Sequence, residues 1–212
     1  MNLLQRFMRF FFNLLYHPFA FTYDLVAATV SFGQWKNWVY SILPFIEGTR
    51  ILELGHGPGH LQRILLTQRS LVAVAIDESA PMGRLAKRRL GGSHRLARAL
   101  AQKIPFAAET FDSIISTFPS EYIFDMQTLS EAHRVLRSSG RLIVLLAAWP
   151  RNPLLARLFK ITGQSPSEAY DSIKSKIKET LAQADFKSEV QIVEVKSGNL
   201  LVVIAHKEET KC

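Results

Sequence analysis

Residues 51–60 read ILELGHGPGH, and this stretch decides the fold of the chain. Apolar, β-favouring residues surround one acidic residue, a glycine-rich turn follows, and the next segment has helical spacing. A first parallel strand that ends in such a turn brings a nucleotide-like ligand to the N-terminus of the following helix. The stretch therefore predicts a cofactor-binding enzyme.

The chain has 212 residues, of which 48% are hydrophobic and 21% are charged. We expect one globular domain over residues 48–212, preceded by an N-terminal helical extension or lid over residues 1–47. Cys212 is the only cysteine, which excludes an internal disulfide and favours a reducing cytoplasm. The apolar stretch from Phe10 to Phe32 is interrupted by polar residues, which argues against a membrane span or a cleavable signal.

Short β-branched runs alternate with helical segments from Thr49 onward. This alternation predicts a parallel sheet with both faces covered, and Ser197-Gly198 predicts a closing antiparallel hairpin. The fold class is α/β: a Rossmann-like, doubly wound, seven-stranded sheet, mostly parallel, with a C-terminal antiparallel hairpin and N-terminal helices. The strands are expected at 50–54, 71–76, 95–99, 112–117, 141–148, 186–196 and 199–206, and the helices between them at 58–67, 80–90, 126–137, 153–161 and from Ser165 onward.

Three further helices are expected before the first strand, at residues 1–15, 19–30 and 34–43. In the first of them the polar residues form one narrow stripe, and every other residue is Met, Leu or Phe. So wide an apolar surface needs cover from the domain itself, a partner subunit or a lipid surface. We expect residues 1–15 to contact a membrane surface or to form a homodimer, in a cytoplasmic protein with or without membrane association.

The glycine turn contains Gly55, Gly57 and Gly59, with His56 between the first two. Glycine lets the backbone approach a ligand closely and adopt positive φ angles. A dinucleotide fingerprint requires a further glycine where this chain has His60, and the charge of Glu53 would repel a pyrophosphate. Glu53 could instead pair with a cationic amino group, which favours a nucleoside that carries an amino acid.

Asp77 lies at the end of the predicted second strand, 22 residues after Gly55, the first glycine of the turn. This distance suits a carboxylate that accepts both ribose hydroxyls of an adenosine. The alternative is that Asp77 caps the next helix, although Ser79 could provide that cap.

Together these residues resemble the class I S-adenosylmethionine-dependent methyltransferases over residues 48–148. The matching segments are ELGHGPG (53–59), AIDESAPM (75–82), IPFAAETFDSIIST (104–117) and HRVLRSSGRLIVL (133–145). The resemblance implies S-adenosylmethionine as cofactor, and many relatives carry an aspartate where this chain has Leu100. The cofactor-binding residues that it implies are Glu53, Gly55, His56, Gly57 and Gly59 around the methionine part, Asp77 at the ribose, Met82, Ala101 and Gln102 near the adenine, and Thr117 and Tyr23 beside them.

Methyl transfer from a sulfonium is an in-line displacement, so alignment in a dry pocket supplies much of the catalysis. A base is needed only if the acceptor must lose a proton, and the candidate catalytic residues are Glu121, His56 and His17. Tyr23 and Tyr122 could orient the acceptor. No local His, Asp and Glu spacing is typical of a metal site, so no metal is expected.

The acceptor is expected to be a small lipophilic or aromatic molecule, because the segment before the first strand is rich in Phe, Trp and Tyr. In outline the chain resembles the quinone and lipid methyltransferases. Residues 116–122 lack the Asn/Asp-Pro-Pro-Tyr/Phe tetrad that holds a flipped base, so nucleic-acid base methylation is disfavoured. An NAD-dependent oxidoreductase is disfavoured by His60 and by the closing hairpin.

A non-catalytic or RNA-directed member of the same fold is the main alternative. The formal net charge is +8, and a basic surface could bind an anionic partner or could merely solvate helix faces. The basic residues concerned are Arg84, Lys87, Arg88, Arg89, Arg95, Arg98, Lys103, Arg134, Arg137, Arg141, Arg151, Arg157 and Lys160.

Overall fold

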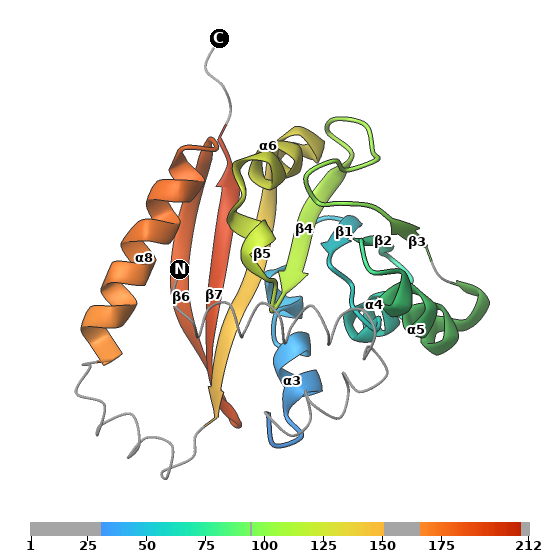
Figure 1. The fold of residues 1–212 in the computed structure, drawn as a ribbon, viewed down its shortest axis with the longest axis horizontal. Coiled ribbons are helices and arrows are strands. Elements are labelled where there is room, and N and C mark those ends of the chain that lie inside the picture. The colour runs from blue at the N-terminus through green and yellow to red at the C-terminus, as the bar shows by residue number, and fades with distance from the viewer. Residues whose placement is uncertain (1–30, 94, 151–165, 209–212) are drawn as a thin grey trace.

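The computed structural model describes residues 31–93, 95–150 and 166–208 (Figure 1). The helices expected at 1–15, 19–30 and 153–161 lie outside these ranges, as do His17 and Tyr23. The strands are β1 (Arg50–Leu54), β2 (Val72–Asp77), β3 (Leu96–Arg98), β4 (Phe111–Thr117), β5 (Leu136–Pro150), β6 (Phe186–Val195) and β7 (Gly198–Lys207). The helices are α3 (Trp35–Tyr40), α4 (His60–Leu65), α5 (Ala80–Leu90), α6 (Met126–Val135) and α8 (Pro166–Ala182), with 3-10 turns η2 (Leu43–Phe45), η3 (Gly91–Ser93) and η4 (Glu121–Phe124).

The seven strands form one sheet in the order β3-β2-β1-β4-β5-β7-β6. Strands β1 to β5 run parallel to one another, and β7 is inserted antiparallel between β5 and β6. From β1 the chain first proceeds to the β3 edge and then crosses to β4, so the strand order reverses beside β1, where ligands bind in open α/β sheets. The predicted fold class, including the hairpin, is confirmed.

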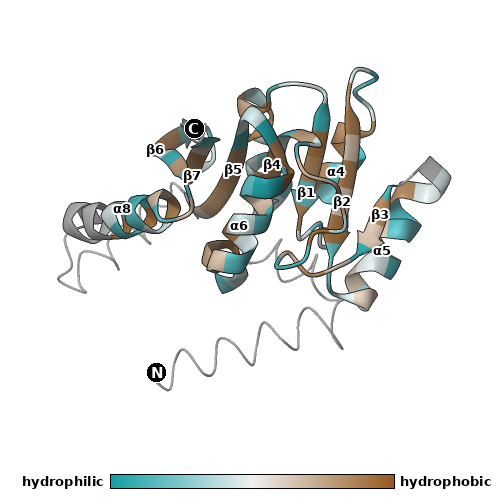
Figure 2. Ribbon diagram, turned by 90° about the horizontal axis from the view of Figure 1, so that it is seen from above, coloured by the Kyte–Doolittle hydropathy of each residue, from teal (hydrophilic) through white to brown (hydrophobic). Residues whose placement is uncertain are grey.

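Helices cover both faces of the sheet, as Figures 1 and 2 show. On one face, Ile51, Ile115 and Ile143 of the sheet pack with buried residues of α3 and α4. On the other face, alternate strand residues such as Leu52 pack with α6 and α8. Strand side chains alternate between faces, so the strands other than β3 contribute to both cores. Figure 2 shows hydrophobic residues along the strands and hydrophilic ones on outer parts of the helices.

Strand β5 is longer than predicted. It begins at Leu136, directly after Val135 of α6, and continues to Pro150. Its last residues pair with β7, ending at Pro150 opposite Gly198, and Leu136 pairs with Phe111. A pattern in residues 126–150 carries no information about these distant partners, which fix the strand through backbone hydrogen bonds. The predicted helix 126–137 and strand 141–148 therefore have wrong inner boundaries.

The turn before β1 is fixed by Asp112. Its Oδ2 atom accepts hydrogen bonds from the backbone N–H groups of Thr49 and Arg50, both at 2.8 Å, and its Oδ1 atom accepts one from Arg137 at 2.8 Å. Burial opposes ionisation, but these hydrogen bonds hold the pKa of Asp112 below its ordinary value. Gly48 has a φ of 74°, and a Cβ atom there would overlap the Asp112 side chain.

We predict that Gly48→Ala lowers the free energy of unfolding by about 2 to 4 kcal/mol, because it combines an unfavourable φ with a steric clash. Chemical denaturation monitored by circular dichroism would measure the loss. The matched control is Gly92→Ala, since a Cβ at Gly92 meets open space. Similar losses in the two variants would contradict the role given to Asp112.

Candidate active site

Three polar side chains share one face and one edge of the sheet. Glu53 of β1 lies beside Ala75 of β2 and Ile115 of β4 in the parallel register. Asp77 and Thr117 follow two residues further along those strands. Parallel neighbours share a face and alternate residues repeat it, so all three lie on the side covered by α3 and α4.

The glycine turn adopts left-handed backbone conformations. The φ angles are 72° at Gly55, 50° at Gly57 and 82° at Gly59. The N–H of Gly55 donates to the carbonyl of Ile76 at 2.8 Å, which joins the turn to β2. A Cβ on Gly59 would lie 3.1 Å from that of Ala86, so the third glycine lets α4 approach α5. The expectation that the turn requires positive φ angles is confirmed.

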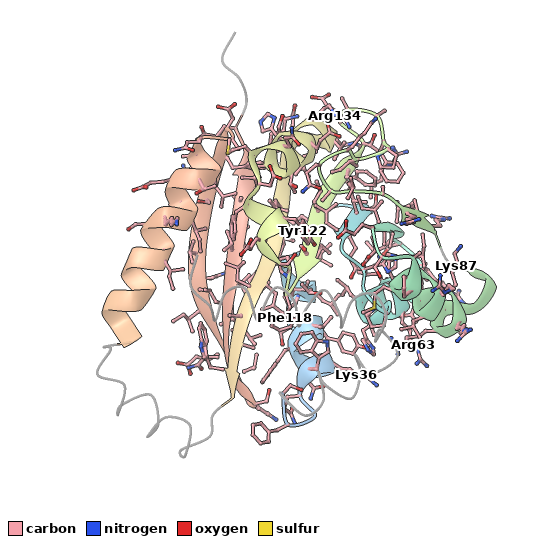
Figure 3. The ribbon with its side chains drawn as sticks, viewed as in Figure 1. Lys36, Arg63, Lys87, Phe118, Tyr122 and Arg134 are labelled. Atoms are coloured by element: carbon pink, nitrogen blue, oxygen red, sulfur yellow. The ribbon has the colours of Figure 1, made fainter. Side chains whose placement is uncertain are left out.

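A cavity lies at this edge, between the glycine turn and α3. Glu53 reaches it although the residue is only 1% exposed. The ring of Trp35, on α3, stacks on Phe118 with centroids 4.1 Å apart. Figure 3 places Phe118 beside α3, with Tyr122 nearby. The cavity is lined by Trp35, Val39, Glu53, Gly55, His56, Gly57, Pro58, His60, Leu61 and Thr117.

The carboxyl group of Glu53 is held in an unfavourable environment for a charge. Burial raises its pKa to about 8, a hydrogen bond from Gln62 lowers it, and the charge of Asp77 raises it. The Gln62 Nε2 atom donates to Glu53 Oε2 at 2.9 Å. A buried carboxyl that faces a cavity is suited to a ligand group that brings a positive charge.

Asp77 joins the glycine turn to the start of α5. Its Oδ2 atom accepts a hydrogen bond from the N–H of Gly57 and its Oδ1 atom accepts one from Ser79, both at 2.8 Å. The hydroxyl of Ser79 accepts from the N–H of Met82 at 3.2 Å and so caps α5. The alternative that Asp77 provides this cap is therefore wrong, and Ser79 fills the position.

His56 is 4% exposed and belongs to the cavity lining. Its Nδ1 atom lies 2.6 Å from the carbonyl oxygen of Gly57, which can only accept, so the proton is on Nδ1. Burial lowers the pKa of His56 below its ordinary value, against opposing contributions from Asp77 and the backbone. The imidazole is therefore neutral near pH 7, and Nε2 is the nitrogen that can accept a proton.

The other predicted residues that the structure describes, Gly59 and Asp77 included, lie outside the cavity lining. Met82 is fully buried at the start of α5, and Ala101 is 9% exposed. The Nε2 atom of Gln102 donates to Asp125 Oδ2 at 3.2 Å, at the start of α6. Glu121 is exposed at the first residue of η4. Among the described residues that follow β2 and were predicted to belong to the site, only Thr117 lines the cavity.

Several residues of the site were not singled out from the sequence. Val39, His60 and Leu61 line the cavity, and Gln62 bonds to Glu53. The Tyr122 hydroxyl, which was expected to orient an acceptor, donates to the carbonyl of Leu54 at 3.1 Å and so supports the end of β1. The sequence signal for Gln62 is weak: it consists only of the position of this residue about one helical turn after the last glycine.

Many of the basic residues stabilise the fold. Arg134 bonds to Glu131 and to the carbonyls of Ile104 and Phe106, while Arg137 pairs with Asp112 and Arg141 with Glu47. The exposed ones in the described ranges include Arg84, Lys87 and Arg88 on α5. Arg151, Arg157 and Lys160 lie outside the described residues. Among the helices that the structure describes, none combines the length and apolar character needed to cross a membrane.

Comparison with known proteins identifies the family. Residues 52–144 match a methyltransferase domain family. The ubiquinone/menaquinone biosynthesis C-methyltransferase UbiE of Geotalea uraniireducens is 30% identical over 195 residues, which cover 82% of this chain and 83% of that protein. UbiE of Syntrophotalea carbinolica is 34% identical over 154 residues, covering 69% of this chain and 65% of that protein.

Solved structures share the fold. An S-adenosylmethionine-dependent methyltransferase of Thermotoga maritima, described as a possible histamine N-methyltransferase, has a TM-score of 0.63 at 18% identity, over 92% of this chain and 99% of that one. Phosphoethanolamine N-methyltransferase 2 of Haemonchus contortus, solved with S-adenosylmethionine, has a TM-score of 0.57 at 14% identity, over 84% of this chain and 53% of that one.

The strand order is that of a Rossmann-like fold, with two carboxylates beside a glycine turn at its strand ends. The chain belongs to the class I S-adenosylmethionine-dependent methyltransferase family, and within that family it resembles the quinone methyltransferases. Its cofactor is S-adenosylmethionine. The alternative of an NAD-dependent oxidoreductase is thereby set aside.

We predict that the free energy of unfolding of Glu53→Gln, in the absence of ligand, increases relative to that of the wild type as the pH rises. The pKa of Glu53 is near 8 in the fold and near 4.5 in the unfolded chain, so the folded state binds the proton more tightly between these values. The wild type should lose about 1.4 kcal/mol of stability relative to Glu53→Gln per pH unit in that window. Urea unfolding of both proteins at pH 5, 6, 7 and 8 measures this difference, and a constant difference would contradict the burial of an ionisable carboxyl.

Proposed function

We propose that this methyltransferase transfers a methyl group from S-adenosylmethionine to a carbon atom of a small, planar, apolar acceptor of the quinol type. Trp35, which lines the cavity and stacks on Phe118, is the observation that carries this proposal. The UbiE relatives, named as quinone C-methyltransferases, support the same acceptor class.

The described residues fit the cofactor. A buried carboxyl with a raised pKa suits the ammonium group, so we assign that group to Glu53. Asp77, which already accepts from the glycine turn, is assigned to the ribose hydroxyls, and the glycines leave space for the methionine part. When bound, the cofactor supplies an electrophilic methyl group on a good leaving group.

We assign the acceptor to the side of the cavity formed by Trp35, on which Phe118 stacks. Phe118 follows the last residue of β4 and has a φ of 49°, a conformation that is strained for a bulky side chain. Its N–H donates to the carbonyl of Leu145 at 2.7 Å, which keeps the backbone there. In this conformation the Phe118 ring stacks on Trp35, and a flat apolar surface of this kind favours a planar acceptor and excludes water.

Helix α3 supports the lid role that we assign to residues 1–47. Trp35 and Val39 of this helix line the cavity opposite the glycine turn. The described part of the N-terminal segment therefore covers the face from which Glu53 reaches the cavity. A segment in this position controls which acceptor reaches the methyl group.

His56 is assigned as the base. Methylation of a quinol at carbon releases a proton, and the imidazole is neutral and part of the cavity lining. Glu121 is solvent-exposed and absent from that lining, so it is less suited to the same role.

Methyl transfer from labelled S-adenosylmethionine to a reduced short-chain benzoquinol or naphthoquinol would test the acceptor class. We expect Trp35→Ala and Phe118→Ala to raise the KM for the quinol about tenfold or more, because the acceptor loses its stacking surface. Phe106→Leu is the matched control, since Phe106 packs on Phe111 at the opposite end of β4. Methylation of a small polar amine, but of no quinol, would overturn the proposal.

We predict that His56→Gln lowers kcat by about 100-fold or more, while calorimetry shows little change in affinity for S-adenosylhomocysteine. In the wild type the lowered pKa of His56 keeps the base unprotonated, so kcat should stay constant from pH 8 down to its ordinary pKa of 6.5 and fall only below it. A kcat within twofold of wild type in His56→Gln would remove His56 from catalysis.

A further inference from the structure

Gln62 is a completely buried polar residue of α4, next to the apolar residues Leu61 and Leu65. Its Nε2 atom donates to Glu53 Oε2 at 2.9 Å. Its Oε1 atom is also buried and has no hydrogen-bond partner among the residues that the structure describes. One side of the amide is therefore satisfied by Glu53, and the other side is an acceptor without a donor.

Packing alone does not explain this side chain. An amide oxygen buried without a partner costs about 1 to 3 kcal/mol, which an apolar residue of similar size would avoid. The oxygen and the nitrogen are bonded to the same carbon, so the unpaired acceptor lies close to the Glu53 carboxyl. A carboxylate and an amide oxygen placed together form a binding site for a group with several donors, such as an ammonium.

We propose that Gln62 is a positioning residue of the cofactor site, whose amide nitrogen holds the Glu53 carboxylate for the cofactor ammonium and whose oxygen accepts a hydrogen bond from the same ammonium. This inference rests on the placement of that ammonium at Glu53 under the proposed function. An ammonium has three N–H donors, so it can satisfy Glu53 and the unpaired oxygen together.

The same contact controls the protonation of the site. Burial raises the pKa of Glu53 to about 8, and the hydrogen bond from Gln62 is what lowers it. Below pH 8, a cation can bind to ionised Glu53 only if the carboxyl loses its proton. The affinity for the cation therefore increases by up to about tenfold for each unit by which the pH rises toward 8. Without the Gln62 amide the pKa of Glu53 rises further. The increase in affinity for the cation then occurs at a higher pH.

Calorimetric titration of the full-length protein with S-adenosylhomocysteine between pH 6 and 9 tests this inference. We expect Gln62→Met to bind at least tenfold more weakly at pH 7, with its affinity profile displaced to higher pH. Repeating the titration at pH 8, where wild-type Glu53 is about half protonated, in buffers of different ionisation enthalpy should show more protons released on binding by Gln62→Met than by the wild type. Leu65→Val, one turn along the same buried face, should retain the wild-type profile.

Thermal unfolding establishes that each variant is folded, and Gln62→Leu provides a second apolar replacement. An unchanged affinity and profile in a folded Gln62 variant would overturn the proposal. A loss of affinity that is equal at every pH would overturn it too, because it indicates a packing role only. The Glu53→Gln variant separates a failure of the Gln62 proposal from a failure of the cofactor placement. If this variant keeps the wild-type dependence of affinity on pH, the ammonium does not bind at Glu53 and the cofactor placement is wrong.

Discussion

The burial of one carboxyl group, that of Glu53, is the constraint on which this site depends. The group lies on a strand face where Ile51 belongs to the apolar core, and it keeps a proton to a pH near 8 in the free protein. Such a group is costly unless a ligand compensates it. The glycine turn, the amide of Gln62 and the cavity beside α3 are arranged around this carboxyl, so the proposed binding of the cofactor ammonium at Glu53 would relieve a cost carried by the free fold.

The fold and the cofactor motif were predictable because their signals are local. The strand–turn–helix pattern at 50–65 and the acidic end of β2 each depend on neighbouring residues, and parallel pairing then brings Glu53 and Asp77 to one edge. The ends of β5 were not predictable, because they are fixed by pairing with β7 and with Phe111. The hydrophobic periodicity of a short segment does not indicate which distant strands it pairs with.

The acceptor side of the site was only partly predictable, for the same reason. Aromatic residues before the first strand indicated an apolar acceptor, but which of them would reach the cavity depends on how α3 packs. Trp35 reaches it because its ring stacks on Phe118, a residue more than 80 positions away in the sequence. Gln62 was missed because a glutamine in a helix is usually solvated, and only the tertiary structure shows that it is buried against Glu53.

Helix α3 is also attached to the β6–β7 hairpin. The indole Nε1 of Trp38 donates to the hydroxyl of Ser197 at 2.9 Å, in the turn between β6 and β7. During synthesis the glycine turn leaves the ribosome long before this hairpin exists. Helix α3, which lines the cavity, thus gains this anchor only after the β6–β7 hairpin has been synthesised, so a nascent polypeptide carries the glycine turn well before α3 is held in place opposite it.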